Sequence, residues 1–236
     1  MKIGELVKMA AVAVIMALFA GCGGGSSTPS PPPATSKTYA SGTASAGLIK
    51  NGTIQIYAAN SDGSKGTLLA STTTDSQGQY TVTVQNYQGP VVIEATGSYV
   101  DEATSATTTI PASAPLRAGS MVSGDGSSIK IAVTPLTELA YRQAVAAAAG
   151  GTPIGTAISN ANNQVSSTFG IDVLQVQPVE ATQTALEGAT MDQRAYVLAL
   201  AGISQMSMTG NLSLTDTIGH MMQSEAPATD VTTAQN

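Results

Sequence analysis

The chain has 236 residues and a formal net charge of −6, and only 10% of its residues are charged. The basic residues are scattered singly, which argues against a nucleic-acid partner, because proteins that bind phosphate backbones gather Lys and Arg on one face. With a single cysteine, the fold cannot depend on an internal disulfide. Packed apolar surface must therefore supply its stability.

The N-terminal segment has the order of a secretory signal. Lys2 and Lys8 flank a short charged region, and an uninterrupted apolar stretch over residues 9–20 follows it, just before Cys22. The stretch is shorter than a transmembrane helix requires. It resembles a bacterial lipoprotein signal, with Phe19 where that family prefers an aliphatic residue. The resemblance implies cleavage before the cysteine and its lipidation; ordinary secretion with a spare thiol is the alternative.

A lipid anchor would fix where the protein acts. Without the signal peptide of residues 1–21, the chain keeps seven basic and fourteen acidic residues. Residues 22–37 would then be the lipidated cysteine and a disordered linker of Gly, Ser and Pro, which lacks the apolar residues needed for packing. Gly23 is not the aspartate that retains such lipoproteins in the inner membrane. The resemblance thus implies a lipid-anchored protein of the outer membrane, facing the periplasm or the cell surface.

An apolar period of two predicts a β-rich domain over residues 38–133. Strands are expected around residues 54–58, 80–84, 91–95 and 129–133, with weaker candidates at 40–46, 67–73, 107–111 and 116–122. Turn-forming Asn, Asp and Gly residues separate them. About eight short strands at this spacing predict a β-sandwich.

The apolar period changes to that of helices at Thr134, and residues 134–224 are expected to form a small helical region. Helices are predicted over residues 135–149, 156–168, from 191 onward and from about 214 to 223. Thr134 with Pro135 starts the first, and a capping box at Thr190 starts the third. Residues 225–236 are expected to be a disordered tail or a truncated end.

Residues 42–99 carry the turn pattern of a known β-sandwich family. Its parts are Gly42-Thr43-Ala44, Asn51-Gly52-Thr53-Ile54 and Thr74-Asp75-Ser76-Gln77-Gly78-Gln79-Tyr80. The pattern resembles the transthyretin-like repeat called the carboxypeptidase regulatory-like domain, with Ala44 in place of the usual Val and a longer first hairpin. The resemblance implies a transthyretin/Ig-like sandwich that acts as a supporting or binding module without an active site. Val133–Leu139 is also similar to segments of bacterial surface lipoproteins.

The sequence offers little for common hydrolytic or metal chemistry. His220, the only histidine, has no evident partner for a Ser-His-Asp arrangement, and one His with one Cys is too few for a usual zinc site. Weak calcium candidates are the loop carboxylates of Asp62, Asp75, Asp101, Glu102 and Asp125, for which turn formation is the alternative. Adjacent Asp101 and Glu102 also offer two carboxylates, but neighbours on a strand point to opposite faces. No cofactor is expected.

Tyrosines supply the candidate ligand surface. Tyr57, Tyr87 and Tyr99, together with Tyr39, would stack on sugars if they were exposed side by side. The sequence therefore predicts a non-catalytic binding or scaffolding module of the cell envelope, with a surface glycan or an envelope protein as partner. One alternative is a glycan-active enzyme that uses Asp101, Glu102 or Asp125. The other is a structural subunit that docks through an exposed apolar stripe on the helix at 134–149.

Overall fold

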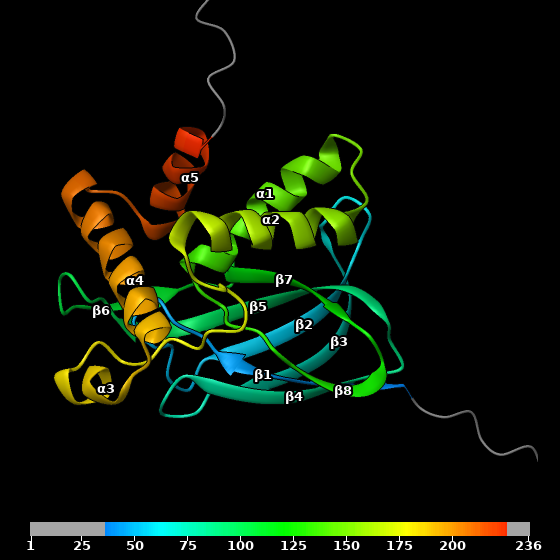
Figure 1. Cartoon of the computed structure of the whole chain (residues 1–236), viewed down its shortest axis with the longest axis horizontal. Coiled ribbons are helices and arrows are strands. Elements are labelled where there is room, and N and C mark those ends of the chain that lie inside the picture. The colour runs from blue at the N-terminus through cyan, green and yellow to red at the C-terminus, as the bar shows by residue number, and fades with distance from the viewer. Residues whose placement is uncertain (1–35, 226–236) are drawn as a thin grey trace, which may run out of the picture. The chain divides into compact units, whose positions relative to one another are not determined.

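Eight strands form two β-sheets, and helices pack on one of them (Figure 1). The computed structural model describes residues 36–225. The three-stranded sheet has the order β4–β1–β8 and consists of β1 (Lys37–Thr43), β4 (Gln79–Gln85) and β8 (Asp125–Lys130). Strand β1 pairs antiparallel with β4 and parallel with β8.

The five-stranded sheet is built around the long strand β5 (Gly89–Val100). Its other strands are β2 (Thr53–Ala59), β3 (Lys65–Thr73), β6 (Thr107–Ile110) and β7 (Leu116–Val122), and its main path runs β3–β2–β5–β6. Both β6 and β7 pair with β5, β6 with its last four residues and β7 with its first seven. The prediction of a β-rich region followed by helices is confirmed.

The core between the sheets follows the alternation in the sequence. Ile54 and Ile56 of β2 are buried together with Tyr80 and Val84 of β4 in one hydrophobic cluster. Strand β5 departs from the alternation, because residues 91–95 are all buried. Both faces of this strand are covered, one by the opposite sheet and the other by helices.

The helices follow the strands, and the first two of them form a third layer over β5 and β7 (Figure 1). The helices are α1 (Pro135–Ala149), α2 (Ile154–Phe169), α3 (Gln183–Gly188), α4 (Met191–Gly210) and α5 (Leu214–Glu225). Thr134 and Thr190 are N-caps, as the sequence predicts. Both have complete capping boxes, of which the sequence predicts only the one at Thr190. Helix α3 is not predicted, and α2 begins two residues earlier than expected.

The sheets and helices share one hydrophobic core. The hydroxyl of Tyr196 on α4 lies 2.7 Å from the Thr134 hydroxyl and donates to the Val173 carbonyl over 2.9 Å, in a fully buried position. The described residues belong to one compact unit. Strand β1 already begins at Lys37, the last residue of the predicted linker.

Among residues 36–225, none of the helices combines the length and the apolar character needed to span a membrane. The predictions for the signal peptide, for Cys22 and for the rest of the linker before Ser36 concern residues outside the described range. The same holds for the predicted tail beyond Glu225.

Turn residues of the transthyretin-like pattern have local structural roles. The Asp75 carboxylate accepts hydrogen bonds from the backbone N–H groups of Gln77 and Gln79, over 2.8 and 2.9 Å. Gly42 lies where β1 approaches the Ile131 carbonyl, and a Cβ there would come within 1.9 Å of the carbonyl oxygen. The sequence pattern therefore corresponds to turn geometry and close backbone packing.

Candidate functional site

A groove of about 800 Å³ lies between one end of the five-stranded sheet and helices α1, α4 and α5. One wall is β6 with the loop that follows it, and the other is α4 with its connection to α5. Much of the lining is apolar and includes Ile110, Leu116, Leu200, Ile203, Leu214 and Ile218. Threonine and serine side chains surround these residues. Such a lining is typical of sites that bind an apolar group with a few oriented polar contacts.

Asp101 ties the β5–β6 turn to α4 at the edge of this groove. Its Oδ2 accepts a hydrogen bond from the Ser204 hydroxyl over 2.6 Å, and its Oδ1 accepts from the backbone N–H groups of Ala103 and Thr104. Burial raises the pKa of Asp101, but the hydrogen bonds from Ser204 and Thr104 outweigh it and leave the pKa below its usual range. The carboxylate is therefore charged and already occupied by the turn.

An ionic cluster closes the groove beside α1. Glu138 is 1% exposed, and its carboxylate accepts hydrogen bonds from Arg117 Nε over 2.9 Å and from Arg142 Nε over 2.7 Å. Arg142 also donates to the Thr215 carbonyl on α5 over 3.1 Å. Burial lowers the pKa of Arg117, but its hydrogen bonds with Glu138 more than compensate and raise it. The cluster joins β7, α1 and α5, with two guanidinium groups sharing one buried carboxylate.

Glu102 faces a second, smaller cavity of about 320 Å³ next to the groove. This cavity is also lined by Tyr99 and by the Lys50–Glu180 ion pair, whose atoms lie 2.6 Å apart. The Oε2 atom of Glu102 is buried without a hydrogen-bond partner among the described residues. Burial and the neighbouring charge of Asp101 raise the pKa of Glu102 to about 7.

Opposite pKa shifts on two neighbouring carboxyl groups are a feature of acid–base catalysis. Asp101 and Glu102 show these shifts, but they are adjacent in one turn. The oxygens of Asp101 are engaged by Ser204 and by the turn itself. This arrangement favours a structural role for Asp101 and leaves Glu102 as the carboxyl that can change its charge near neutral pH.

The calcium candidates are spread over four separate turns and do not meet. Asp62 caps a turn through the Ser64 backbone N–H, and Asp125 through that of Ser127, both over 2.9 Å. Hydrogen bonds from Ser123 and Ser127 lower the pKa of Asp125 to about 2. Within the described range, no three His, Cys, Asp or Glu side chains form a group able to hold a metal ion. The turn-forming role accounts for these aspartates.

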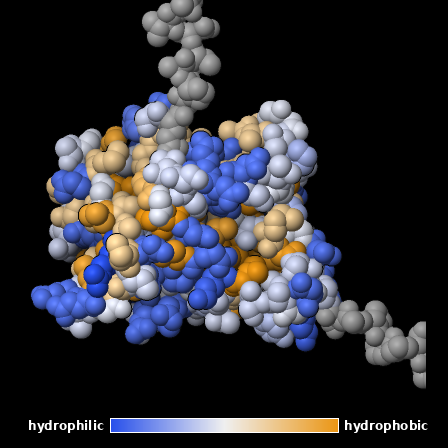
Figure 2. Space-filling view, viewed as in Figure 1, coloured by the Kyte–Doolittle hydropathy of each residue, from blue (hydrophilic) through white to orange (hydrophobic). Residues whose placement is uncertain are grey.

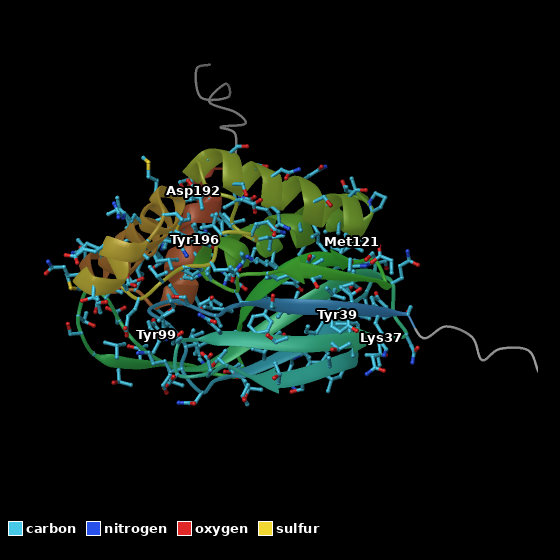
Figure 3. The ribbon with its side chains drawn as sticks, turned by 60° about the horizontal axis from the view of Figure 1, so that its bottom comes forward. Lys37, Tyr39, Tyr99, Met121, Asp192 and Tyr196 are labelled. Carbon is cyan, nitrogen blue, oxygen red and sulfur yellow. The ribbon has the colours of Figure 1, made fainter. Side chains whose placement is uncertain are left out.

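The prediction of one exposed tyrosine surface is wrong for Tyr99. This residue is 5% exposed, because the end of β5 pairs with β6 and lies against the loop at Gly47, and burial raises its pKa to about 12. Tyr57 is half-buried, and Lys65 Nζ lies 5.0 Å from its ring centroid. Figure 3 shows Tyr39 and Tyr99 at opposite ends of the sandwich.

The remaining aromatic and histidine candidates also stand apart. Tyr87 is half-buried, and its hydroxyl donates to the Pro90 carbonyl over 2.7 Å. His220 is exposed on α5. None of these side chains joins the groove.

An exposed apolar surface lies on α4 and not on α1. Residues 135–141 of α1 are all buried, so this helix offers no apolar stripe there. On α4, Met191, Leu198 and Met206 are 84%, 74% and 50% exposed and form what we call the outer face of α4. Figure 2 shows apolar surface over the region where Figure 1 places this helix. Met208 on the same helix is 46% exposed.

The groove itself was not predicted from the sequence. Its walls come from β6 and from α4, which are about 90 residues apart in the chain and lie together only in the folded protein. The one local indication of the groove in the sequence is the absence of charged residues over positions 195–210 of α4.

Comparison with protein-family models gives no match for this chain, and comparison with curated proteins gives none either. The resemblance of residues 42–99 to the carboxypeptidase regulatory-like domain therefore remains a prediction.

Proposed function

We propose that this protein is a cell-envelope lipoprotein, attached to the outer membrane through a lipid on Cys22. Its folded part is a transthyretin-like sandwich with helices, and it acts as a non-catalytic binding or scaffolding module. The groove between β6, α4 and α5 is the binding site. The observation that carries this proposal is the position of the groove relative to the point where the chain enters the domain.

The groove and the start of the described chain lie at opposite ends of the domain. The Lys37 backbone N–H donates to the Gly124 carbonyl, next to β7 residues that pair with the first residues of β5. The groove lies at the last residues of β5, beside Tyr99 and Asp101. The 12 residues of β5 correspond to roughly 35 Å of extended strand. Figure 3 shows Lys37 and Tyr99 far apart accordingly. A tether joined at Ser36 thus leaves the groove free.

The lining of the groove favours a protein partner over a glycan. Sugar sites commonly use exposed aromatic faces, and the candidate tyrosines are buried, half-buried or on separate strands. The groove instead offers aliphatic side chains such as Leu200, Ile203 and Ile218, with hydroxyl groups at its rim. An apolar segment of an envelope protein fits this surface best.

A second candidate function is docking as a structural subunit through the outer face of α4. Met191, Leu198 and Met206 form an exposed apolar surface that a larger complex would cover. The glycan-active enzyme is the weakest alternative, because Asp101 is engaged in its turn and Asp125 is exposed in a distant one.

The membrane address is tested by replacing the cysteine that carries the lipid. In fractionated cells the parent protein should sediment with the outer membrane, and Cys22→Ser should lose that association. Mass spectrometry of the parent should find a mature N-terminus at Cys22 that carries acyl chains. A variant that stays in the membrane pellet like the parent contradicts the anchor.

The binding site is tested with two methionines on the same helix. Met208 lines the groove, whereas Met206 belongs to the outer face of α4, and the two are similarly exposed. Met208→Glu should abolish recovery of a partner protein after cross-linking in cells, because a charge would enter the apolar groove. Met206→Glu should leave recovery unchanged. Loss with Met206→Glu alone would favour the structural-subunit alternative.

A further inference from the structure

Strand β6 has an edge without a strand partner. It pairs only with β5, in the register Gly97 to Ile110 through Val100 to Thr107. The Asp101 N–H bonds to the Ala106 carbonyl in the same register, so the backbone groups of alternate residues face β5. Those of Thr107 and Thr109 therefore point away from it, and they bond to no other described residue.

This free edge borders the groove. Thr108, Thr109 and Ile110 are consecutive residues of β6, and all three line the groove. Successive side chains of a strand point to opposite faces, so a cavity that touches three in a row meets the strand along its edge. The unpaired backbone groups and the apolar lining therefore belong to the same surface.

Two of the other edge strands, β3 and β8, carry protection that β6 lacks. Strand β3 starts at Lys65, and its pairing with β2 has two register shifts. Strand β8 ends at Lys130, and its pairing with β1 is also irregular. Lysines and bulges are common devices that prevent an edge from pairing with another chain. The sequence of β6 is Thr-Thr-Thr-Ile, which has no charge and favours strand pairing.

Charged side chains beside the groove are already engaged in hydrogen bonds. Arg142 is bound to Glu138 and to the Thr215 carbonyl, and Asp101 is bound to Ser204. The rest of the groove lining is uncharged, so a charged residue entering it would lose its hydration, which opposes binding. The groove therefore selects an uncharged segment.

We propose that β6 and the groove bind an extended, uncharged segment of a partner protein by strand addition. The segment pairs with the backbone groups of Thr107 and Thr109 and places alternate apolar side chains against the groove lining, a known mode of peptide recognition. Because β6 has only four residues, the apolar contacts supply much of the affinity. This inference rests on the proposed function and names the class of partner.

The test uses a labelled synthetic heptapeptide with the sequence of residues 79–85, which is uncharged and has alternate apolar residues. It is titrated against the full chain by fluorescence anisotropy. Two further peptides carry N-methyl groups on alternate amides, one peptide for each edge of the extended peptide. Strand addition uses one edge only, so one of them should bind at least about tenfold more weakly while the other binds like the parent. Equal affinities of the two methylated peptides would overturn the proposal.

Variants of β6 provide the matching test on the protein. Thr109→Pro removes an outward N–H and should weaken peptide binding at least about tenfold, whereas Thr109→Val keeps the backbone and should bind within about twofold of the parent. Urea unfolding of both variants checks that the domain remains folded. Binding unchanged by Thr109→Pro, or no binding of the parent peptide at about 1 mM, contradicts strand addition.

The two proposals fail in different ways. If the peptide does not bind but recovery of a partner in cells still depends on Met208, strand addition is wrong and the groove remains the site. If Met208→Glu has no effect in cells, the proposed function is wrong whatever the peptide does.

Discussion

Helices α1 and α4 begin with the same capping box, yet they have different surroundings. The first seven residues of α1 are buried between the sheet and other helices. Helix α4 buries Tyr196, Leu200 and Ile203 on one side and exposes Met191 and Leu198 on the other. Local sequence thus determines where both helices start, whereas tertiary packing decides that α1 is enclosed and that α4 keeps an exposed face.

Two glutamates, Glu138 and Glu102, differ in a similar way between the two regions. Glu138 on α1 is buried, and both of its oxygens are bound by arginines. Glu102 near α4 has a buried oxygen without a partner, and its pKa is raised to about 7. Removing one member of a buried ion pair destabilises the fold, because the remaining charge loses its partner. A buried carboxyl without a partner instead changes its protonation state near neutral pH.

The largest expected effect comes from breaking the Glu138 cluster. Glu138→Gln leaves Arg117 and Arg142 without a counter-charge and should lower the free energy of unfolding by about 3 kcal/mol in urea titrations. The control is Glu180→Gln, which removes the exposed pair with Lys50 and should cost about 1 kcal/mol or less. Equal losses for the two variants would mean that the Glu138 cluster is not buried.

Removing the hydroxyl of Tyr196 should have the next largest effect. Tyr196→Phe leaves the Val173 carbonyl and the Thr134 hydroxyl without this partner in the core, at a cost of about 1–3 kcal/mol in the free energy of unfolding. Tyr39→Phe changes an exposed tyrosine and should have almost no effect. A cost for Tyr196→Phe as small as for Tyr39→Phe would show that the hydrogen bonds from α4 to the start of α1 and to the segment after α2 contribute no stability.

Glu102 should make stability depend on pH in a defined direction. Its pKa in the folded protein is about 7, above the unfolded value, so its stabilising contribution is complete at acid pH and is lost as pH rises through 7. Glu102→Gln removes this loss. Between pH 5 and pH 8, the free energy of unfolding of this variant should rise relative to that of the parent by on the order of 1 kcal/mol. This value is reduced for solvent screening, because the side chain is partly exposed.

Urea unfolding at the two pH values measures this difference, and an NMR titration of the Glu102 carboxyl carbon should have its midpoint near 7. A midpoint in the usual range for glutamate, with the same pH dependence in parent and variant, would mean that the side chain is solvated.

The smallest effect is expected on the outer face of α4. Leu198 is 74% exposed, so Leu198→Gln should change the free energy of unfolding by less than about 0.5 kcal/mol. A loss of more than about 1 kcal/mol, measured on the monomer, would show that this side chain is packed and that α4 has no free face.

Much of the fold follows from local chemistry that the sequence displays. The alternation at Ile54 and Ile56, and the caps at Thr134 and Thr190, are short-range signals, and the structure has the expected strands and helices there. Helix α3 has a cap at Thr182 but no buried residue, and therefore no apolar periodicity to reveal it. Its C-terminal end is held by Arg194, which donates to the Leu186 and Glu187 carbonyls.

The candidate site depends on contacts between distant parts of the chain. Tyr99 is buried because β6 and the loop at Gly47 cover the end of β5, which the alternation around Tyr99 does not reveal. The same applies to the Asp101–Ser204 contact, which joins residues 103 positions apart. Sequence patterns report the face that a residue occupies within its own element, but not which other element covers it.

Site-specific photo-cross-linking in intact cells tests the groove most directly. A photoreactive amino acid replaces Met208 in one strain and Met206 in another, two similarly exposed positions of α4 of which only Met208 lines the groove. We expect a discrete cross-linked protein from position 208 and none from position 206. Adducts from position 206 alone, or from neither position, would contradict the assignment of the groove as the binding site.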